Sequence, residues 1–154
     1  MYDREGNMQG APWEWNRGPI GRLLKVAYLT VRREAEEQIR EEGLTHTQWS
    51  AIGILHHYPG MAASEMEHIL MIERPSVTSL INGLVKKELV VRREDPHDAR
   101  YKRLYLTEEG LRTAERTGHV TRTVDERVRQ GMSPEEVDTL RYLLEKLVGV
   151  FGKP

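Results

Sequence analysis

The chain of 154 residues contains no cysteine, a single phenylalanine and no long apolar run. Without cysteine it can form neither a disulfide scaffold nor a thiolate metal site, and it has no cysteine nucleophile or thiol redox sensor. No segment approaches the about 18 consecutive apolar residues of a membrane-spanning helix. The N-terminal segment also lacks the apolar region of a secretion signal. We therefore expect a cytoplasmic protein with no membrane partner.

The net charge is small, at −1, but the charges are unevenly distributed. Residues 74–103 contain eight lysines and arginines against four acidic residues, a local charge of +4. A basic stretch in a near-neutral chain is typical of a local nucleic-acid contact. Taken alone, such a cluster is more often a solvated surface, so the pattern needs support from the elements around it.

Hydrophobic periodicity and capping signals predict six helices separated by short turns. Gly43 ends the first helix, and Thr45 with Gln48 has the spacing of a capping box that begins the second. Ser133 begins the last helix, with proline at its first position. The expected helices run from 19 to 43, from 45 to a break at Pro59, over about 62–70, from about 73–75 past Val85, from 107 to about 130, and from 133 to 151.

A hairpin is expected between the fourth and fifth helices. The segments 89–94 and 101–106 are rich in β-forming residues and flank a polar, turn-rich centre, which indicates a hairpin with a long loop. Three short helices followed by a hairpin form the plan of a winged helix-turn-helix. The expected fold class is therefore mainly α with a small β-hairpin wing, in which N- and C-terminal helices flank the winged core.

The fourth helix has one apolar and one polar side. Its apolar stripe, expected to be buried, consists of Val77, Leu80, Ile81, Leu84 and Val85. The opposite side carries hydroxyls, an amide and cations, which can bond base edges or phosphates in the major groove of DNA. The candidate DNA contacts on this side are Arg74, Ser76, Thr78, Ser79, Asn82 and Lys86. An ordinary polar surface is the alternative, and the basic hairpin that follows favours DNA.

The hairpin supplies a second set of candidate DNA contacts. These are Arg92, Arg93, Asp98, Arg100 and Lys102. Arg100 falls in the expected loop, and an arginine on a projecting loop can enter the minor groove, where negative potential is concentrated. The alternative is a surface loop in which Arg100 forms only a local salt bridge with Asp98, worth at most about 1 kcal/mol.

Several segments together resemble the MarR family of transcription regulators in order and spacing. They are LTHTQWSAIGIL (44–55), PG (59–60), RPSVTSLINGLVKKELVVR (74–92), EDPHDAR (94–100) and LTEEG (106–110). The resemblance, over about residues 19–151, implies a homodimer that binds double-stranded DNA at a pseudo-palindromic operator, as a repressor released by a ligand. It also implies that the fourth helix enters the major groove and that Arg100 enters the minor groove with Asp98 as its orienting partner.

Three residues depart from the pattern of the family. Glu88 stands where a glycine usually follows the fourth helix, and a left-handed backbone there costs a glutamate about 1 kcal/mol. Ser79 stands where arginine or lysine is common. Ala62 replaces the usual N-cap residue of the third helix, and alanine caps poorly. These departures affect the expected affinity and DNA sequence rather than the resemblance itself.

The expected organisation has four parts. They are a flexible N-terminal arm (1–18), an N-terminal dimerisation helix (19–43), the winged helix-turn-helix domain (44–106) and C-terminal helices that complete the dimerisation domain (107–154). The apolar stripes of the first and last helices are too wide for the small core to cover, which also predicts a two-fold dimer. The alternative is that these helices pack on each other within one chain. Trp13 and Trp15 in the arm leave open whether it docks on the body.

The family resemblance places a ligand cavity between the dimerisation helices and the winged core. Tyr28, His46, Trp49 and Arg92 are candidates for its lining, and aromatic walls with an arginine suit a small aromatic or phenolic anion. Tyr28 and Trp49 are equally well explained as core residues. A winged-helix protein–protein adaptor without sequence-specific DNA binding is the alternative function.

Neither a cofactor nor a metal is expected. The six histidines include no pair at the i, i+4 spacing of a helical metal site, and no cysteine is present to assist them. The sequence also lacks the phosphate-binding loops and nucleophile motifs that mark common enzyme classes. We therefore expect a protein without enzymatic activity.

Overall fold

The computed structural model describes residues 18–152. Its internal contacts divide the chain into two compact units, residues 1–34 and 35–154. In the first unit the described residues form most of helix α1 (Ile20–Ile39). The predictions for the N-terminal arm, including Trp13 and Trp15, lie outside the described residues. Among those described, no helix is both long and apolar enough to cross a membrane.

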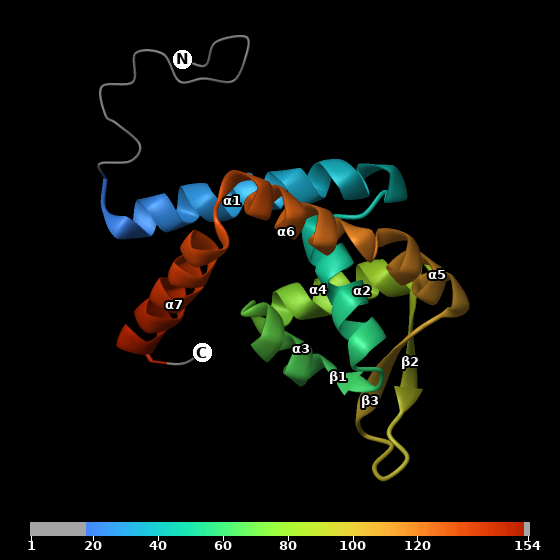
Figure 1. The fold of residues 1–154 in the computed structure, drawn as a ribbon. Coiled ribbons are helices and arrows are strands. Elements are labelled where there is room, and N and C mark those ends of the chain that lie inside the picture. The colour runs from blue at the N-terminus through green and yellow to red at the C-terminus, as the bar shows by residue number, and fades with distance from the viewer. Residues whose placement is uncertain (1–17, 153–154) are drawn as a thin grey trace. The chain divides into compact units, whose positions relative to one another are not determined.

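The second unit begins within the last turns of α1 and contains all the remaining elements (Figure 1). They are the 3₁₀ helix η1 (Arg40–Glu42), α2 (His46–His57), β1 (Met61–Ala62), α3 (Ala63–Leu70), α4 (Arg74–Lys86), β2 (Val90–Glu94), β3 (Lys102–Leu106), α5 (Glu108–Thr117), α6 (His119–Gly131) and α7 (Pro134–Val150). Helices dominate and the single sheet is small. This confirms the predicted fold class.

The ends of the helices follow the predicted local signals. Gly43 ends η1 with a φ of 65°, a left-handed conformation that glycine adopts without strain. The Thr45 hydroxyl accepts a hydrogen bond from the Gln48 N–H, and the Gln48 side chain accepts one from the Thr45 N–H. Ser133 and Glu136 form the same reciprocal pair at the start of α7. Each capping box satisfies two N–H groups that the helix itself cannot satisfy.

One hydrophobic core joins α2, α3, α4 and the sheet. The predicted stripe of α4 is buried at Val77, Leu80, Ile81 and Leu84, while Val85 packs against the core at its edge. The largest side chains that are essentially inaccessible in this core are Ile52, Leu55, Met66, Val77, Leu84 and Leu104. Because the apolar side of α4 faces this core, its polar side remains at the surface.

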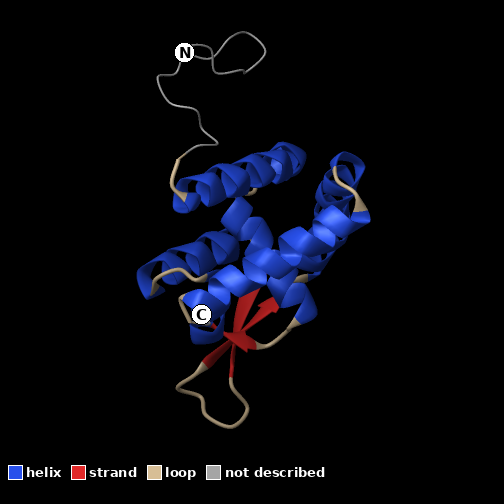
Figure 2. Ribbon diagram, turned by 60° about the vertical axis from the view of Figure 1, so that its left-hand side comes forward, coloured by secondary structure: helices blue, strands red, loops and turns tan. Residues whose placement is uncertain are grey.

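The sheet has three antiparallel strands in the order β1-β3-β2, and the loop between β2 and β3 projects away from the helices (Figure 2). We predicted the hairpin but not β1, whose two residues are too few to show an alternating pattern. Met61 of β1 pairs with Leu104. Gly60, just before it, has a φ of 83°, and a Cβ there would lie 2.8 Å from the Tyr105 hydroxyl. Glycine is therefore required at this turn.

The prediction of one helix from Thr107 to about Gln130 is wrong, because α5 and α6 are separate. The Gly118 N–H bonds the Glu115 carbonyl three residues back, at 3.4 Å, rather than the carbonyl four residues back. The carbonyl of Arg116 is contacted by the His119 ring nitrogen Nδ1 at 2.8 Å. Gly118 keeps a right-handed backbone, with a φ of −61°. The backbone is therefore wound more tightly at this break, and the spacing of apolar residues in the sequence does not reveal it.

Helix α7 differs from the other long helices because none of its residues is buried. Leu140, Leu143, Leu144 and Val148 are 41–53% exposed. These four residues, which we call the α7 apolar face, recur at helical spacing and lie on one side of the helix. Within residues 35–152, no other side chains cover this face well enough to bury it.

Candidate nucleic-acid interface

The six candidate contacts of α4 all lie at the surface, as residue spacing predicts. The helix begins after Glu73, with Pro75 in its first turn, where a missing N–H costs little. Within this face the Thr78 hydroxyl donates to the Arg74 carbonyl at 3.0 Å. The face therefore offers hydroxyls, one amide and two cations to a partner, and it carries no carboxylate beyond Glu73.

A direct contact joins this polar face to the hairpin. Arg92 Nη2 of β2 donates to the side-chain oxygen of Asn82 at 2.6 Å, and both residues are exposed. The hairpin therefore stands beside the polar face of α4. The structure brings together two candidate residues that sequence reasoning had assigned to separate groups.

At the tip of the hairpin, Asp98 holds Arg100. Arg100 Nε lies 2.9 Å from one carboxylate oxygen of Asp98, and Nη2 lies 2.6 Å from the other. The Arg100 N–H also donates to this carboxylate at 3.0 Å. The side-chain bonds and then the backbone bond from Arg100 lower the pKa of Asp98 below its usual value, and the side-chain bonds raise the pKa of Arg100. The Arg100 side chain nevertheless remains 86% exposed.

The other wing cations also have partners. Lys102 pairs with Glu94 at 2.8 Å across the strands, and this hydrogen bond lowers the pKa of Glu94. The guanidinium of Arg93 lies 5.1 Å from the centre of the Tyr105 ring, a cation–π contact. All of these contacts are at the surface. Exposed ion pairs contribute little to stability, so these contacts orient the cations and leave them available to an external partner.

Arg103, which sequence analysis did not select, anchors the hairpin. Its Nε lies 2.6 Å from Asp95 Oδ2, and its Nη1 lies 3.4 Å from both Glu65 and the Gly60 carbonyl. A hydrogen bond from the His97 N–H and the bond from Arg103 lower the pKa of Asp95. Arg103 therefore ties the base of the loop to α3 and to the turn before β1. Two of its partners, Glu65 and Gly60, lie 38 and 43 residues away in the sequence, so no local signal identified it.

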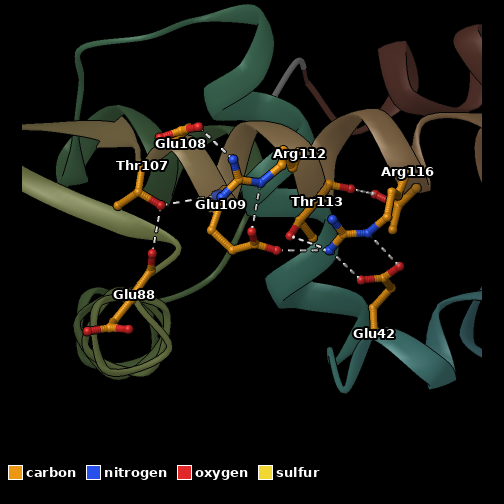
Figure 3. Close-up of polar contacts among 10 residues, drawn as sticks. Glu42, Glu88, Thr107, Glu108, Glu109, Arg112, Thr113 and Arg116 are labelled. Carbon is orange, nitrogen blue, oxygen red and sulfur yellow. Dashed lines mark hydrogen bonds and ion pairs between the residues drawn. The ribbon is translucent and has the colours of Figure 1, made fainter.

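The C-terminal end of α4 is held from two sides. Glu88 has a φ of 57°, which confirms the left-handed backbone expected at this position. Its carbonyl accepts a bond from the Thr107 hydroxyl at 2.6 Å (Figure 3). Lys87 Nζ donates to the Gly43 carbonyl and, at 3.1 Å, to Gln48 Oε1. The end of the polar helix is thus connected to the turn before α2 and to the start of α5.

A second polar cluster joins η1 to α5 (Figure 3). Arg116 makes two bonds to the Glu42 carboxylate, at 3.1 and 3.0 Å, and contacts Glu109 and the Thr113 hydroxyl at 3.1 Å each. The bonds from Arg112 and then Arg116 lower the pKa of Glu109. Sequence reasoning did not find this cluster, because Glu42 and Arg116 are 74 residues apart.

The comparison with protein-family models matches residues 42–100 of this winged core to the MarR family. The winged core is thus a MarR-family domain. This match confirms the resemblance drawn from the sequence motifs, and it supports a transcriptional regulator rather than an enzyme.

Three known proteins are similar to this chain over most of its length. The homoprotocatechuate degradative operon repressor of Escherichia coli is 26% identical over 131 residues, which are 82% of this chain and 88% of the repressor. The repressor CouR, solved bound to a 23-mer DNA duplex, has a TM-score of 0.76 and 27% identity, over 84% of this chain and 92% of CouR. The MepR–DNA complex from S. aureus, at 20% identity, shares the fold with a TM-score of 0.82, over 87% of this chain and 99% of MepR.

Three of the four ligand candidates lie in the second unit, and they are not gathered at one place. Trp49 lines a cavity of about 420 Å³ between α2, α5 and α6, and the ring of His46 lies edge-on to Trp49 at 5.4 Å. Arg92 instead lines a separate hollow between α3, α4 and the hairpin. Tyr28 belongs to the first unit and is 56% exposed. The expected combination of Trp49 with Arg92 in one cavity therefore does not occur in the second unit, because β2 holds Arg92 beside Asn82.

The described residues contain no group of three histidine, aspartate or glutamate side chains arranged to hold a metal ion. His56 and His57 have rings 5.4 Å apart, inclined to each other by 58°. Both line the cavity with Trp49. The rings of both histidines therefore form part of the aromatic wall of this cavity.

Proposed function

We propose that this MarR-family regulator is a homodimeric repressor that binds a pseudo-palindromic operator through α4 and the hairpin. The observation that carries the proposal is the tip of the hairpin, where Asp98 extends Arg100 and leaves its cation exposed. In the proposed complex α4 lies in the major groove and Arg100 enters the minor groove. The DNA-bound CouR structure and the operon repressor of E. coli support this assignment.

The remaining candidate residues serve this complex in two ways. Four side chains of α4 have polar groups suited to base edges: Ser76, Thr78, Ser79 and Asn82. Positively charged side chains instead suit phosphates. The proposed phosphate contacts are Arg74, Lys86, Arg93 and Lys102. Their exposure supports the proposal, since a group that meets DNA must be accessible in the free protein.

The α7 apolar face supports the proposed homodimer. Exposed apolar patches of this kind usually mark interfaces, and a two-fold axis would bring two copies of the patch together. Such a dimer would present two copies of α4 about 34 Å apart, one turn of DNA. The proposed dimerisation regions, residues 19–43 and 107–154, would flank the winged core at residues 44–106.

We propose the Trp49 cavity as the site of a small ligand that releases DNA. Its lining includes Trp49, His57, Tyr58 and Thr117, and none of the described residues that line it is lysine, arginine, aspartate or glutamate. A cavity without a permanent cation suits an uncharged phenol or other planar aromatic better than a carboxylate, because a buried charge requires a partner. If the ligand lowers the affinity for DNA by some factor, thermodynamic linkage requires that DNA lower the affinity for the ligand by the same factor.

The DNA-binding proposal is tested by selecting bound sequences from a random DNA pool and measuring the affinity of the selected duplex against salt. We expect a palindromic motif and a steep fall in affinity as salt rises, because each neutralised phosphate releases about 0.9 counterion. A salt-independent interaction, or no selected motif, would instead favour the protein–protein adaptor. Light scattering tests the dimer, since a monomeric mass at micromolar concentration would contradict it.

A further inference from the structure

We infer that Arg92 of β2 fixes the direction in which Asn82 of α4 presents its side-chain amide, so that Asn82 offers only hydrogen-bond donors to DNA and rejects cytosine. The inference rests on the proposed DNA-binding function and specifies the base selectivity of one position in that site. Arg92 acts here as a positioning residue, because its effect on base choice passes through Asn82. The two residues lie on different elements, and their contact spans ten positions of the sequence.

The contact determines which way round the amide sits. Arg92 Nη2 lies 2.6 Å from Asn82 Oδ1. A guanidinium carries donors and no acceptor, whereas an amide carries an oxygen that accepts and an NH₂ that donates. The reversed amide would set two donors against each other. The oxygen of Asn82 must therefore face Arg92, and the direction of the amide follows from the chemistry of its partner.

The NH₂ group of Asn82 is then left for an external partner. In the described part of the chain no hydrogen bond engages it, and Asn82 is exposed on the polar face of α4. Its neighbours on that face behave differently. The hydroxyls of Thr78 and Ser79 can rotate and serve as either donor or acceptor, although Thr78 donates to the Arg74 carbonyl in the free protein. The Asn82 amide differs from these hydroxyls because Arg92 of β2 fixes which of its ends donates toward the surface.

The major groove distinguishes bases by such polarity. Guanine presents the acceptors N7 and O6, adenine presents N7, and thymine presents O4. Cytosine presents only its N4 amino group, which is a donor. An NH₂ group held toward the groove can bond any of the first three bases but meets a second donor at cytosine. The position read by Asn82 should therefore exclude cytosine on the contacted strand.

Substitutions at Asn82 test the polarity directly, by selection of bound sequences with the full-length protein. Asn82→Asp keeps the shape and an oxygen for Arg92 but replaces the donors with a second acceptor. We expect this variant to prefer cytosine at that position by about tenfold, since a carboxylate accepts from cytosine N4. Asn82→Ala should accept all four bases there. Both substitutions are at an exposed position, and circular dichroism checks that the fold is retained.

Substitutions at Arg92 test the positioning role. Arg92→Met releases the amide, which can then turn its oxygen to the groove, so cytosine should become acceptable at the same position. Arg92→Lys retains a donor-only side chain and should restore the exclusion. Arg93→Met is the matched control: it removes one positive charge from the next residue of β2, whose side chain lies over Tyr105. It should lower affinity for every sequence and leave base preference unchanged.

The outcomes separate this inference from the function on which it rests. If the wild-type protein selects no sequence, the proposed DNA-binding function fails and the inference fails with it. If the protein selects a motif but accepts cytosine at the position that changes in Asn82→Ala, or if Asn82→Ala changes no position, the inference alone is overturned. An Arg92→Met variant with unchanged base preference would likewise overturn it.

Discussion

The hairpin tip and the α7 apolar face are both exposed, but for different physical reasons. At the tip, Arg100 is charged, 86% exposed and held by Asp98. On α7, Leu143 and Leu144 are 53% and 41% exposed with no charge. A charged surface binds through forces that salt screens, whereas an apolar surface binds through burial, on which salt screening has little effect. The difference fits the two proposed partners, DNA at the hairpin and a second copy of the chain at α7.

The largest expected effect comes from placing charge on the α7 apolar face. Leu143→Glu should convert the proposed dimer to a monomer, because a carboxylate in an apolar interface is desolvated without a partner. Loss of one half of a two-site complex should lower operator affinity at least a hundredfold. Light scattering and DNA titration measure the two effects. Tyr142→Glu, at an exposed position on the opposite side of the same helix, is the control. A Leu143→Glu variant that remains dimeric would contradict the proposed interface.

A smaller effect is expected at the hairpin tip. Arg100→Ala should weaken DNA binding by about tenfold or more without changing the melting temperature, because an exposed side chain leaves no cavity. Asp98→Ala should also weaken binding by a few-fold, although it removes a negative charge, since Arg100 loses the carboxylate that extends it. Fluorescence anisotropy at one salt concentration measures both variants. Tighter binding by Asp98→Ala would show that the carboxylate only repels DNA.

Glu88 provides a test in which stability changes and DNA binding does not. Its φ of 57° is strained for any residue with a Cβ. Glu88→Gly should therefore raise the free energy of unfolding by about 1 kcal/mol. Chemical denaturation measures this gain, with Glu115→Gly, at an exposed helical position, expected to lower stability instead. A destabilised Glu88→Gly would mean that the glutamate side chain contributes more than its backbone costs.

The smallest effect is expected from the cluster around Arg116, and it should depend on pH. The pKa of Glu109 is lowered in the folded protein, so its contribution to stability is present above the ordinary pKa of a glutamate and is lost as the pH falls through the lowered value. Arg116→Met should therefore reduce the melting temperature slightly at pH 7 and less at pH 3. Glu109 and its partners are exposed, so the change is small. An equal loss at both pH values would indicate a packing effect.

Much of the fold was predictable because its signals are local. The capping boxes of Thr45 and Ser133 depend on residues three positions apart, and the buried stripe of α4 depends on helical periodicity. Strand β1 and the break at Gly118 were missed because neither has a pattern long enough to detect. The same local patterns also predicted which candidate site residues lie on α4 and which lie on the hairpin. They did not predict which of these side chains contact each other.

Local sequence patterns were enough to predict the helices of the winged core, the polar face of α4, the basic hairpin and the resemblance to the MarR family. Three contacts appear only in the folded chain: Arg92 with Asn82, Arg103 with Asp95 at the base of the loop, and Arg116 of α5 with Glu42. The physical reason is the range of the interactions. Helix periodicity and capping act over a few residues, whereas the Glu42–Arg116 pair forms only after the chain has closed a loop of more than seventy residues.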